Sequence, residues 1–253
     1  MSAFATLLHK ELDESRRTLR LPVVLGAFLF LGILAPLMAF LTPNLLEATG
    51  NSTLAAALPQ PTINDAIDTF VKNIDQIGSF IAILLAMGMV ANDRERGTAA
   101  FVLTKPVSRG AYLAARFVPL ALLLGAGVVV AAVVTYVYGS ILFTTPSGGG
   151  LAAATLLLWL SLLVPAAVTF LASTVCRSAM VAAMAGFGWW VASSLVAALP
   201  GTGSNLPGGL TAVARDVALG GASGAVLLPV ATSVAIVLLA LGAAWATFRT
   251  QEL

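Results

Sequence analysis

The 253-residue chain is 59% hydrophobic and 9% charged, whereas roughly 25% of the residues in an ordinary soluble domain are charged. Its net charge of +2 is too small to indicate nucleic-acid binding, and its single cysteine, Cys176, excludes an internal disulfide and a multi-cysteine metal site. These values indicate a membrane protein with short loops, and we treat residues 1–253 as a single transmembrane domain.

The most apolar of the stretches that contain no Asp, Glu, Lys or Arg are residues 21–46, 76–92, 117–176, 178–214 and 217–248. An α-helix rises about 1.5 Å per residue, so about 20 apolar residues cross a hydrocarbon core of about 30 Å. Residues 117–176 are long enough for two crossings. Residues 76–92 are long enough for one crossing if the helix begins a few residues before 76. We therefore predict an all-α polytopic membrane protein with six transmembrane helices, at about 21–41, 74–91, 114–139, 151–173, 179–199 and 225–247.

Residues 1–20 precede the first span and form a predicted amphipathic helix lying in the membrane interface. After the first span, a Pro-containing segment becomes helical, with an apolar stripe at Ile63, Ile67, Phe70, Ile74 and Ile77. Its other face carries Asp65, Asp68, Lys72 and Asp75. The pattern predicts an amphipathic outer helix that runs straight into the second span.

Three later connections have their own patterns. Residues 144–150 form a predicted tight outer turn, and residues 175–178 form a very short inner turn. The Gly-rich segment 200–224 contains a short helical pattern at Leu210, Val213, Ala214 and Val217. Such a segment can form a re-entrant element only if protein or water satisfies its backbone.

Lys and Arg are distributed asymmetrically between the two sides. With six spans and both termini inside, 11 of the 13 basic residues face the cytoplasm, and only Lys72 and Arg215 face outward. This distribution follows the positive-inside rule. We expect a multi-pass protein of the plasma membrane with both termini cytoplasmic.

Groups that perform chemistry are scarce. The single histidine, His9, is remote from every span, so neither a Ser–His dyad nor a His-Glu-x-x-His zinc motif exists. No Lys is part of a phosphate-binding loop, so the chain cannot hydrolyse a nucleotide itself. We expect no catalytic, cofactor-binding or metal-binding residue, and no ionisable side chain deep in any span. The energy for uphill transport then has to come from a separate subunit.

Polar and aromatic residues within the spans have structural interpretations first. Small hydroxyl residues commonly pack membrane helices, and we assign this role to Ser161, Ser173, Ser193 and Ser194. In the fifth span, Gly186, Gly188, Trp189 and Trp190 either shape a substrate path or provide close helix packing with an aromatic filler. Close packing is the more ordinary of the two.

The densest polar segment, residues 92–116, joins the second and third spans. Gly97 is expected to end the incoming helix, and Thr98 is suited to cap a short helix that stops at Pro106. Its apolar residues Phe101 and Leu103 either dock a cytoplasmic partner or dip into the membrane interface. The residues alone do not decide between these alternatives.

The same segment resembles the first cytoplasmic loop of type-2 ATP-binding-cassette (ABC-2 type) exporter permeases. The resemblance rests on residues 93–98 (DRERGT), on residues 105–109 (KPVSR) and on the following Tyr112. His9-Lys10-Glu11-Leu12, ahead of the first span, is similar too. The topology also fits over essentially the whole chain, although the motif itself covers only about 25 residues.

The resemblance implies a non-catalytic permease subunit that pairs with a second permease copy, as a homodimer or with a paralogue. Each copy binds a cytoplasmic ATPase, which holds ATP and Mg²⁺, through a coupling helix in this loop. The implied partner-interface residues are Arg94, Glu95, Arg96, Gly97, Thr98, Phe101, Leu103, Lys105, Pro106, Arg109 and Arg177. The alternatives are a secondary carrier and a non-transporting scaffold that docks a cytoplasmic partner.

Overall fold

The computed structural model describes residues 19–48, 60–95, 108–176, 178–199, 203–221 and 226–250. Within these residues, six helices are long and apolar enough to cross a membrane. They cover Arg20–Leu45, Ile63–Asp93, Arg109–Leu142, Gly148–Val175, Ala179–Ala197 and Leu227–Thr250. The predicted all-α fold class with six membrane-spanning helices is confirmed.

The first span is α2 (Arg20–Ala48), and the second is a composite of several helical pieces. The composite comprises α4 (Ile63–Asn73), the π-helix η1 (Ile74–Gly78), α5 (Ser79–Met87) and α6 (Ala91–Glu95). The predicted amphipathic outer helix is α4, and it continues without a break into the span. The second helix therefore begins 11 residues before the predicted start at 74.

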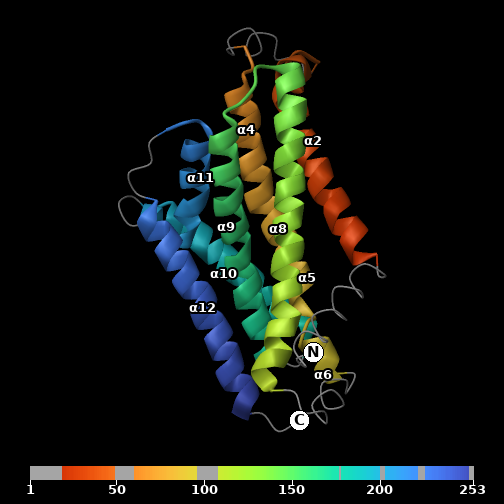
Figure 1. Cartoon of the computed structure of the whole chain (residues 1–253), viewed down its shortest axis with the longest axis vertical. Helices are drawn as coiled ribbons and strands as arrows, with labels where there is room; N and C mark the ends of the chain where they lie inside the picture. The colour runs from red at the N-terminus through yellow and green to blue at the C-terminus, as the bar shows by residue number, and fades with distance from the viewer. Residues whose placement is uncertain are drawn as a thin grey trace.

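The remaining spans are α8 (Arg109–Leu142), α9 (Gly148–Val175), α10 (Ala179–Ala197) and α12 (Leu227–Thr250). Between α10 and α12 lie the 3₁₀ turns η2 (Gly203–Asn205) and η3 (Pro207–Gly209), followed by α11 (Leu210–Ala218). The predicted helix near 210–217 is thus present as α11. In Figure 1, α6, the start of α8 and the end of α12 lie at one end of the bundle, and the α8–α9 connection lies at the other.

Local sequence explains where several helices begin. At α4, the backbone N–H and the hydroxyl of Thr62 each donate to the Asp65 carboxylate at 2.8 Å, which holds the first turn. At α9, the Ser147 hydroxyl oxygen accepts from the backbone N–H of Gly150 at 3.2 Å. The predicted tight turn at 144–150 is shorter than expected, because α9 already starts at Gly148.

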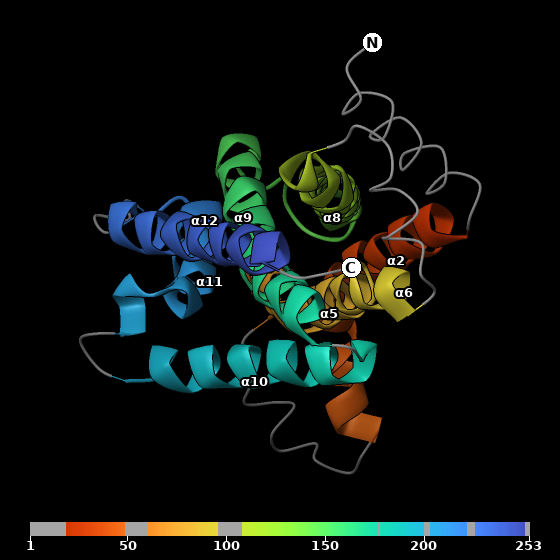
Figure 2. The same ribbon diagram turned by 90° about the horizontal axis from the view of Figure 1, so that it is seen from below.

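Helix α9 is the centre of the bundle and packs against α5, α8, α10, α11 and α12. In the most apolar part of α9, 61% of the residues are buried, against 17% in α10. Accordingly, α10 lies at the edge of the bundle (Figure 2). A buried face of α9 therefore meets almost every element that lines the cavity described below.

Small residues let α2 and α8 approach closely. A Cβ on Gly32 would lie 2.6 Å from the carbonyl oxygen of Ala131, and one on Gly127 would lie 2.6 Å from the Phe28 ring. The Thr135 hydroxyl donates to the carbonyl oxygen of Gly32 at 3.1 Å across the same contact. Glycine contacts and interhelical hydrogen bonds of this kind are the usual means of packing helices in lipid.

Two predicted elements lie outside the described residues. They are the interfacial helix over residues 1–20, apart from its last two positions, and the short coupling helix between Thr98 and Pro106. Gly97, the expected helix breaker, also lies outside. Within the described part, the helix pauses earlier than expected, in a turn at residues 88–90 between α5 and α6.

Candidate functional site

Three of the predicted partner-contact residues lie in the described part of the chain: Arg94, Glu95 and Arg109. Arg94 and Glu95 end α6, where the side chain of Glu95 is exposed, and Arg109 begins α8. The other eight lie outside the described residues, namely Arg96, Gly97, Thr98, Phe101, Leu103, Lys105, Pro106 and Arg177. The partner-contact role of all 11 residues stays a prediction.

Arg109 joins the third span to the sixth. Its guanidinium Nη1 donates to the carbonyl oxygens of Phe248 at 2.7 Å and Arg249 at 2.9 Å, in the last turn of α12. These carbonyls have no partner within their own helix, so a cation there satisfies them and opposes the helix dipole. The Tyr112 ring stacks on Phe248, with ring centres 5.6 Å apart. The start of α8 and the end of α12 are therefore held together.

Asp93 of α6 is the centre of a second polar cluster at the same end. Tyr112 donates its hydroxyl proton to the Asp93 carboxylate at 2.6 Å, and Arg116 forms an ion pair with the same oxygen. Both charged side chains are mostly buried, with exposed fractions of 17% for Asp93 and 18% for Arg116. The two described flanks of segment 96–107 are thus tied to each other by buried polar contacts.

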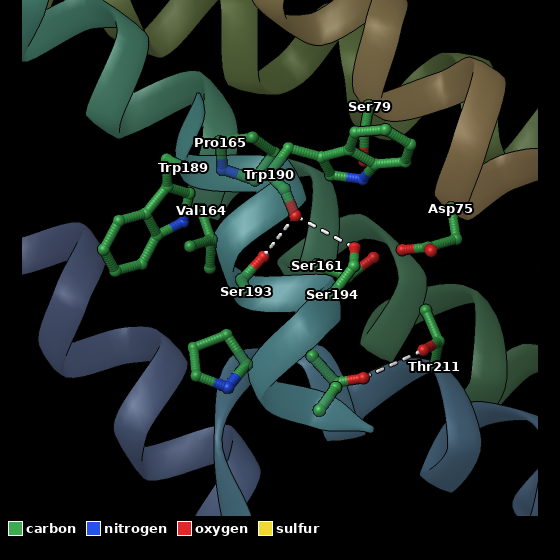
Figure 3. Close-up of a pocket in the computed structure, with 13 residues that line it drawn as sticks. Asp75, Ser79, Ser161, Val164, Pro165, Trp189, Trp190, Ser193, Ser194 and Thr211 are labelled. Carbon is green, nitrogen blue, oxygen red and sulfur yellow. Dashed lines mark hydrogen bonds between the residues drawn. The ribbon is translucent and has the colours of Figure 1, made fainter. Parts of the chain in front are cut away.

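A polar cavity lies among the second, fourth and fifth spans and the connection between α10 and α12, here called the outer connection from its predicted side (Figure 3). It has a volume of about 210 Å³, far above the roughly 10–15 Å³ that one water molecule needs. Its polar lining residues are Asp75, Ser79, Ser161, Ser193, Ser194 and Thr211, together with the indoles of Trp189 and Trp190. Pro207 and Gly208 of η3 close the cavity on the side of the outer connection.

The cavity extends from the connection between α10 and α12 to the middle of α9. Ser161, on its wall, is 13 residues from the first residue of α9 and 14 from the last. At about 1.5 Å per residue, Ser161 is about 20 Å from either end of that span. Ligand sites of membrane transporters commonly lie near the midplane.

Asp75 is the charged residue of this cavity. Among the residues that the structure describes, no Lys or Arg forms an ion pair with it. A carboxylate at membrane depth is costly and marks a functional site by default. We expected no ionisable side chain deep in any span, but Asp75 lies 12 residues into the Ile63–Asp93 span and lines this cavity.

Sequence reasoning missed Asp75 because it placed the polar face of the outer helix in water. In the structure α11 meets only part of that face, where its Arg215 pairs with Asp68, seven residues before Asp75, while Asp65 and Lys72 stay exposed. The π-helix also breaks the 3.6-residue register of the apolar stripe, and Ile77, expected to be buried, is 40% exposed. π-Helical turns occur often at functional sites. The available signal was the spacing of Asp68 and Asp75, which puts both on one helical face.

The fifth span contributes two aromatic side chains to the cavity. Trp189 and Trp190 both line it, and their indole nitrogens are buried without a hydrogen-bond partner among the described residues. Gly186 serves close packing, since a Cβ there would lie 2.0 Å from Thr169 Oγ1, and Gly188 has no atom within 4 Å of such a Cβ. Trp189 and Trp190 therefore fit the substrate-path interpretation of this segment, and Gly186 fits the close-packing interpretation.

Of the four serines predicted to pack helices, one does so and three line the cavity. Ser173 does pack the helices, because its oxygen accepts from the backbone N–H groups of Val90 at 3.1 Å and Ala91 at 3.0 Å. Ser161, Ser193 and Ser194 instead line the cavity, while bonding to carbonyls of their own helices. Within the described ranges, no group of three His, Cys, Asp or Glu side chains is arranged to hold a metal ion.

Comparison with known proteins covers most of the chain. The family model described as "ABC-2 family transporter protein" matches residues 5–206. The uncharacterized transmembrane protein YxlG of Bacillus subtilis (strain 168) is 26% identical over 226 residues, which cover 87% of this chain and 87% of the relative. The family match includes segment 92–116 as well as Asp75, Trp189 and Trp190.

Proposed function

The chain belongs to the ABC-2 family of transporter proteins, and we propose that it is the permease subunit of an ATP-binding-cassette exporter. Proteins of this family are membrane components of transporters and are not themselves catalytic. In the proposal, a separate cytoplasmic ATPase binds and hydrolyses ATP with Mg²⁺, and this chain carries the substrate across the membrane. The family match over residues 5–206 is the observation that carries the proposal.

Coupling through segment 92–116 is the mechanical part of the proposal. Segment 96–107 connects α6 to α8 in the sequence. On its two flanks, Asp93 pairs with Arg116 and Arg109 bonds to the end of α12. A force that an ATPase applies to this segment would reach the second, third and sixth spans together, because buried charged contacts transmit displacement better than a flexible linker. These contacts support the coupling role proposed for Glu95, Phe101 and their neighbours.

Orientation and assembly complete the proposal. The bias of 11 basic residues to 2 supports cytoplasmic termini and a plasma-membrane location. A second permease copy, identical or paralogous, completes the translocation path in the family pattern. The exposed apolar residues of α10, among them Met180 at 71% and Met184 at 68%, then face lipid or that second copy.

The test is co-purification in detergent with the ATPase encoded beside this gene. The parent is expected to form a complex that hydrolyses ATP, and the Glu95→Ala/Phe101→Ala variant is expected to lose it. The matched control is Asp216→Ala/Leu199→Ala, which removes an acid and an exposed apolar side chain near the outer connection, where both are exposed. Equal complex formation by all three proteins would refute the coupling role.

A secondary carrier is the second candidate, because Asp75 provides the membrane-depth ionisable group that such carriers use. Well-folded parent protein that never associates with the ATPase, yet transports substrate in response to an imposed ion gradient, would favour the carrier. Family membership favours the permease.

A further inference from the structure

We propose that the cavity around Asp75 binds the ammonium group of an organic amine, and that amines of this kind are the substrate class of the permease. The binding step stands by itself, and only its use in transport rests on the proposed function. The argument comes from the hydrogen-bonding inventory of the cavity wall.

Four of the five hydroxyl groups on the wall present acceptors to the cavity. Ser193 and Ser194 each donate to the carbonyl oxygen of Trp190 at 2.9 Å, and Ser161 donates to that of Leu158 at 2.7 Å. Thr211 donates to the carbonyl oxygen of Gly208 at 3.1 Å. A hydroxyl has one proton and two lone pairs. Once that proton is directed along the helix, only lone pairs remain for a ligand.

The carboxylate of Asp75 adds the only formal charge among the described residues of the cavity wall. In Figure 3 it points toward Ser161 and Ser194 across the cavity. Four hydroxyl oxygens and a carboxylate together form a surface that accepts hydrogen bonds and carries negative charge. A primary ammonium group matches this surface, because it has three N–H donors, one positive charge and no acceptor.

The two tryptophans specify an organic ligand rather than a bare metal cation. Their indole rings offer apolar and cation-attracting faces, and each indole N–H is a buried donor without a partner among the described residues. A buried donor left unpaired is costly. An oxygen acceptor close to the amine would satisfy one of them. The chemical class that fits is therefore a small amine with a neighbouring hydroxyl or carbonyl oxygen.

Binding can be measured without the ATPase. The probe is 2-amino-1-(4-bromophenyl)ethanol, whose bromine quenches indole fluorescence, and its neutral match is 1-(4-bromophenyl)ethane-1,2-diol, with a hydroxyl in place of the amine. The chain has four tryptophans. In a Trp159→Phe/Trp245→Phe background, the indole fluorescence comes from Trp189 and Trp190 alone. Calorimetric titration of the unmodified parent gives a second measurement that needs no background substitutions.

We expect saturable quenching by the amine at concentrations where the diol does not quench. Asp75→Asn should weaken amine binding by about tenfold or more, because a charge-assisted hydrogen bond is lost. Asp216→Asn is the matched control, since it removes the same charge from an exposed position on neighbouring α11 and should leave the affinity unchanged. Trp190→Phe keeps an aromatic ring but loses the donor, and should weaken binding several-fold.

Equal affinity for amine and diol, or an unchanged affinity in Asp75→Asn, would overturn the ammonium site. If Asp75→Asn does not fold, the amine-to-diol preference of the parent and the loss in Trp190→Phe decide the question. Stimulation of the assembled ATPase complex by the amine supports the substrate assignment. If the amine binds but does not stimulate ATP hydrolysis by an active complex, the substrate assignment is overturned and the ammonium site still stands. Failure of the ATPase to assemble refutes the permease proposal alone, because probe binding is measured without it.

Discussion

Three aspartates of one helical run have three different environments. Asp68, near the start of the second span, pairs with Lys72 and with Arg215 of α11. Asp93, at the far end, pairs with Arg116 and accepts from Tyr112. Asp75, between them, faces a cavity and forms no ion pair within the described residues. A carboxylate held by cations contributes to the fold, whereas one facing a cavity is available to a ligand.

The largest expected effect is at the Asp93 cluster. Arg116→Met removes a cation from mostly buried Asp93, and should lower the free energy of unfolding by about 3 kcal/mol. Titration with a denaturing detergent, followed by far-UV circular dichroism, measures it. The Asp93→Asn/Arg116→Met double variant should recover part of the loss. A stability of Arg116→Met equal to that of the parent would remove the structural role assigned to this pair.

The next effect is at the wall of the cavity. A Cβ on Gly208 would lie 2.6 Å from the Cβ of Ala197 and 2.8 Å from the carbonyl oxygen of Ser193. Gly208→Ala should therefore displace η3 from α10, cost about 1–3 kcal/mol and weaken probe binding. Gly188→Ala, which meets no atom within 4 Å, is the matched control and should be neutral or slightly stabilising. Equal stability in the two variants would contradict the close contact.

Arg109 should have an intermediate effect. Arg109→Gln removes two charge-assisted hydrogen bonds to the last turn of α12 and should cost about 1.5 kcal/mol. The measurement is amide hydrogen exchange over the C-terminal part of α12, which should become faster. The control is Arg249→Gln, which alters a cation–π contact with half-exposed Trp245. Unchanged exchange together with loss of ATPase binding would make Arg109 a partner contact and not a helix clamp.

The smallest expected effect on stability is at Asp75. Asp75→Asn loses no ion pair within the described residues and relieves the desolvation of a charge, so the free energy of unfolding should stay the same or rise. Asp68→Asn is the comparison, and should cost no more than about 1 kcal/mol because its ion pairs are partly exposed. The same denaturation measures both. A large loss in Asp75→Asn would mean that Asp75 supports the fold, and would weaken the ligand-site argument.

The sequence by itself determined the number of spans and most of their positions. Charge-free stretches report which residues can leave water, and the predicted spans overlap all six observed helices. The short helix near Leu210 and the helical continuity from Ile63 into the second span were also predictable, since both are local periodic patterns. The resemblance of residues 93–109 to the family could be recognised from the order of residues alone.

Tertiary structure alone decided the environment of the polar groups. The apolar stripe of α4 indicated which face is buried, but not that Asp68 on the opposite face pairs with α11, or that Asp75 shares a cavity wall with η3 and α11. Likewise, Arg109 finds its acceptors 139 and 140 residues away, at the end of α12. Local hydropathy encodes depth in the membrane, whereas the rotation and partners of each helix depend on how all six spans pack together.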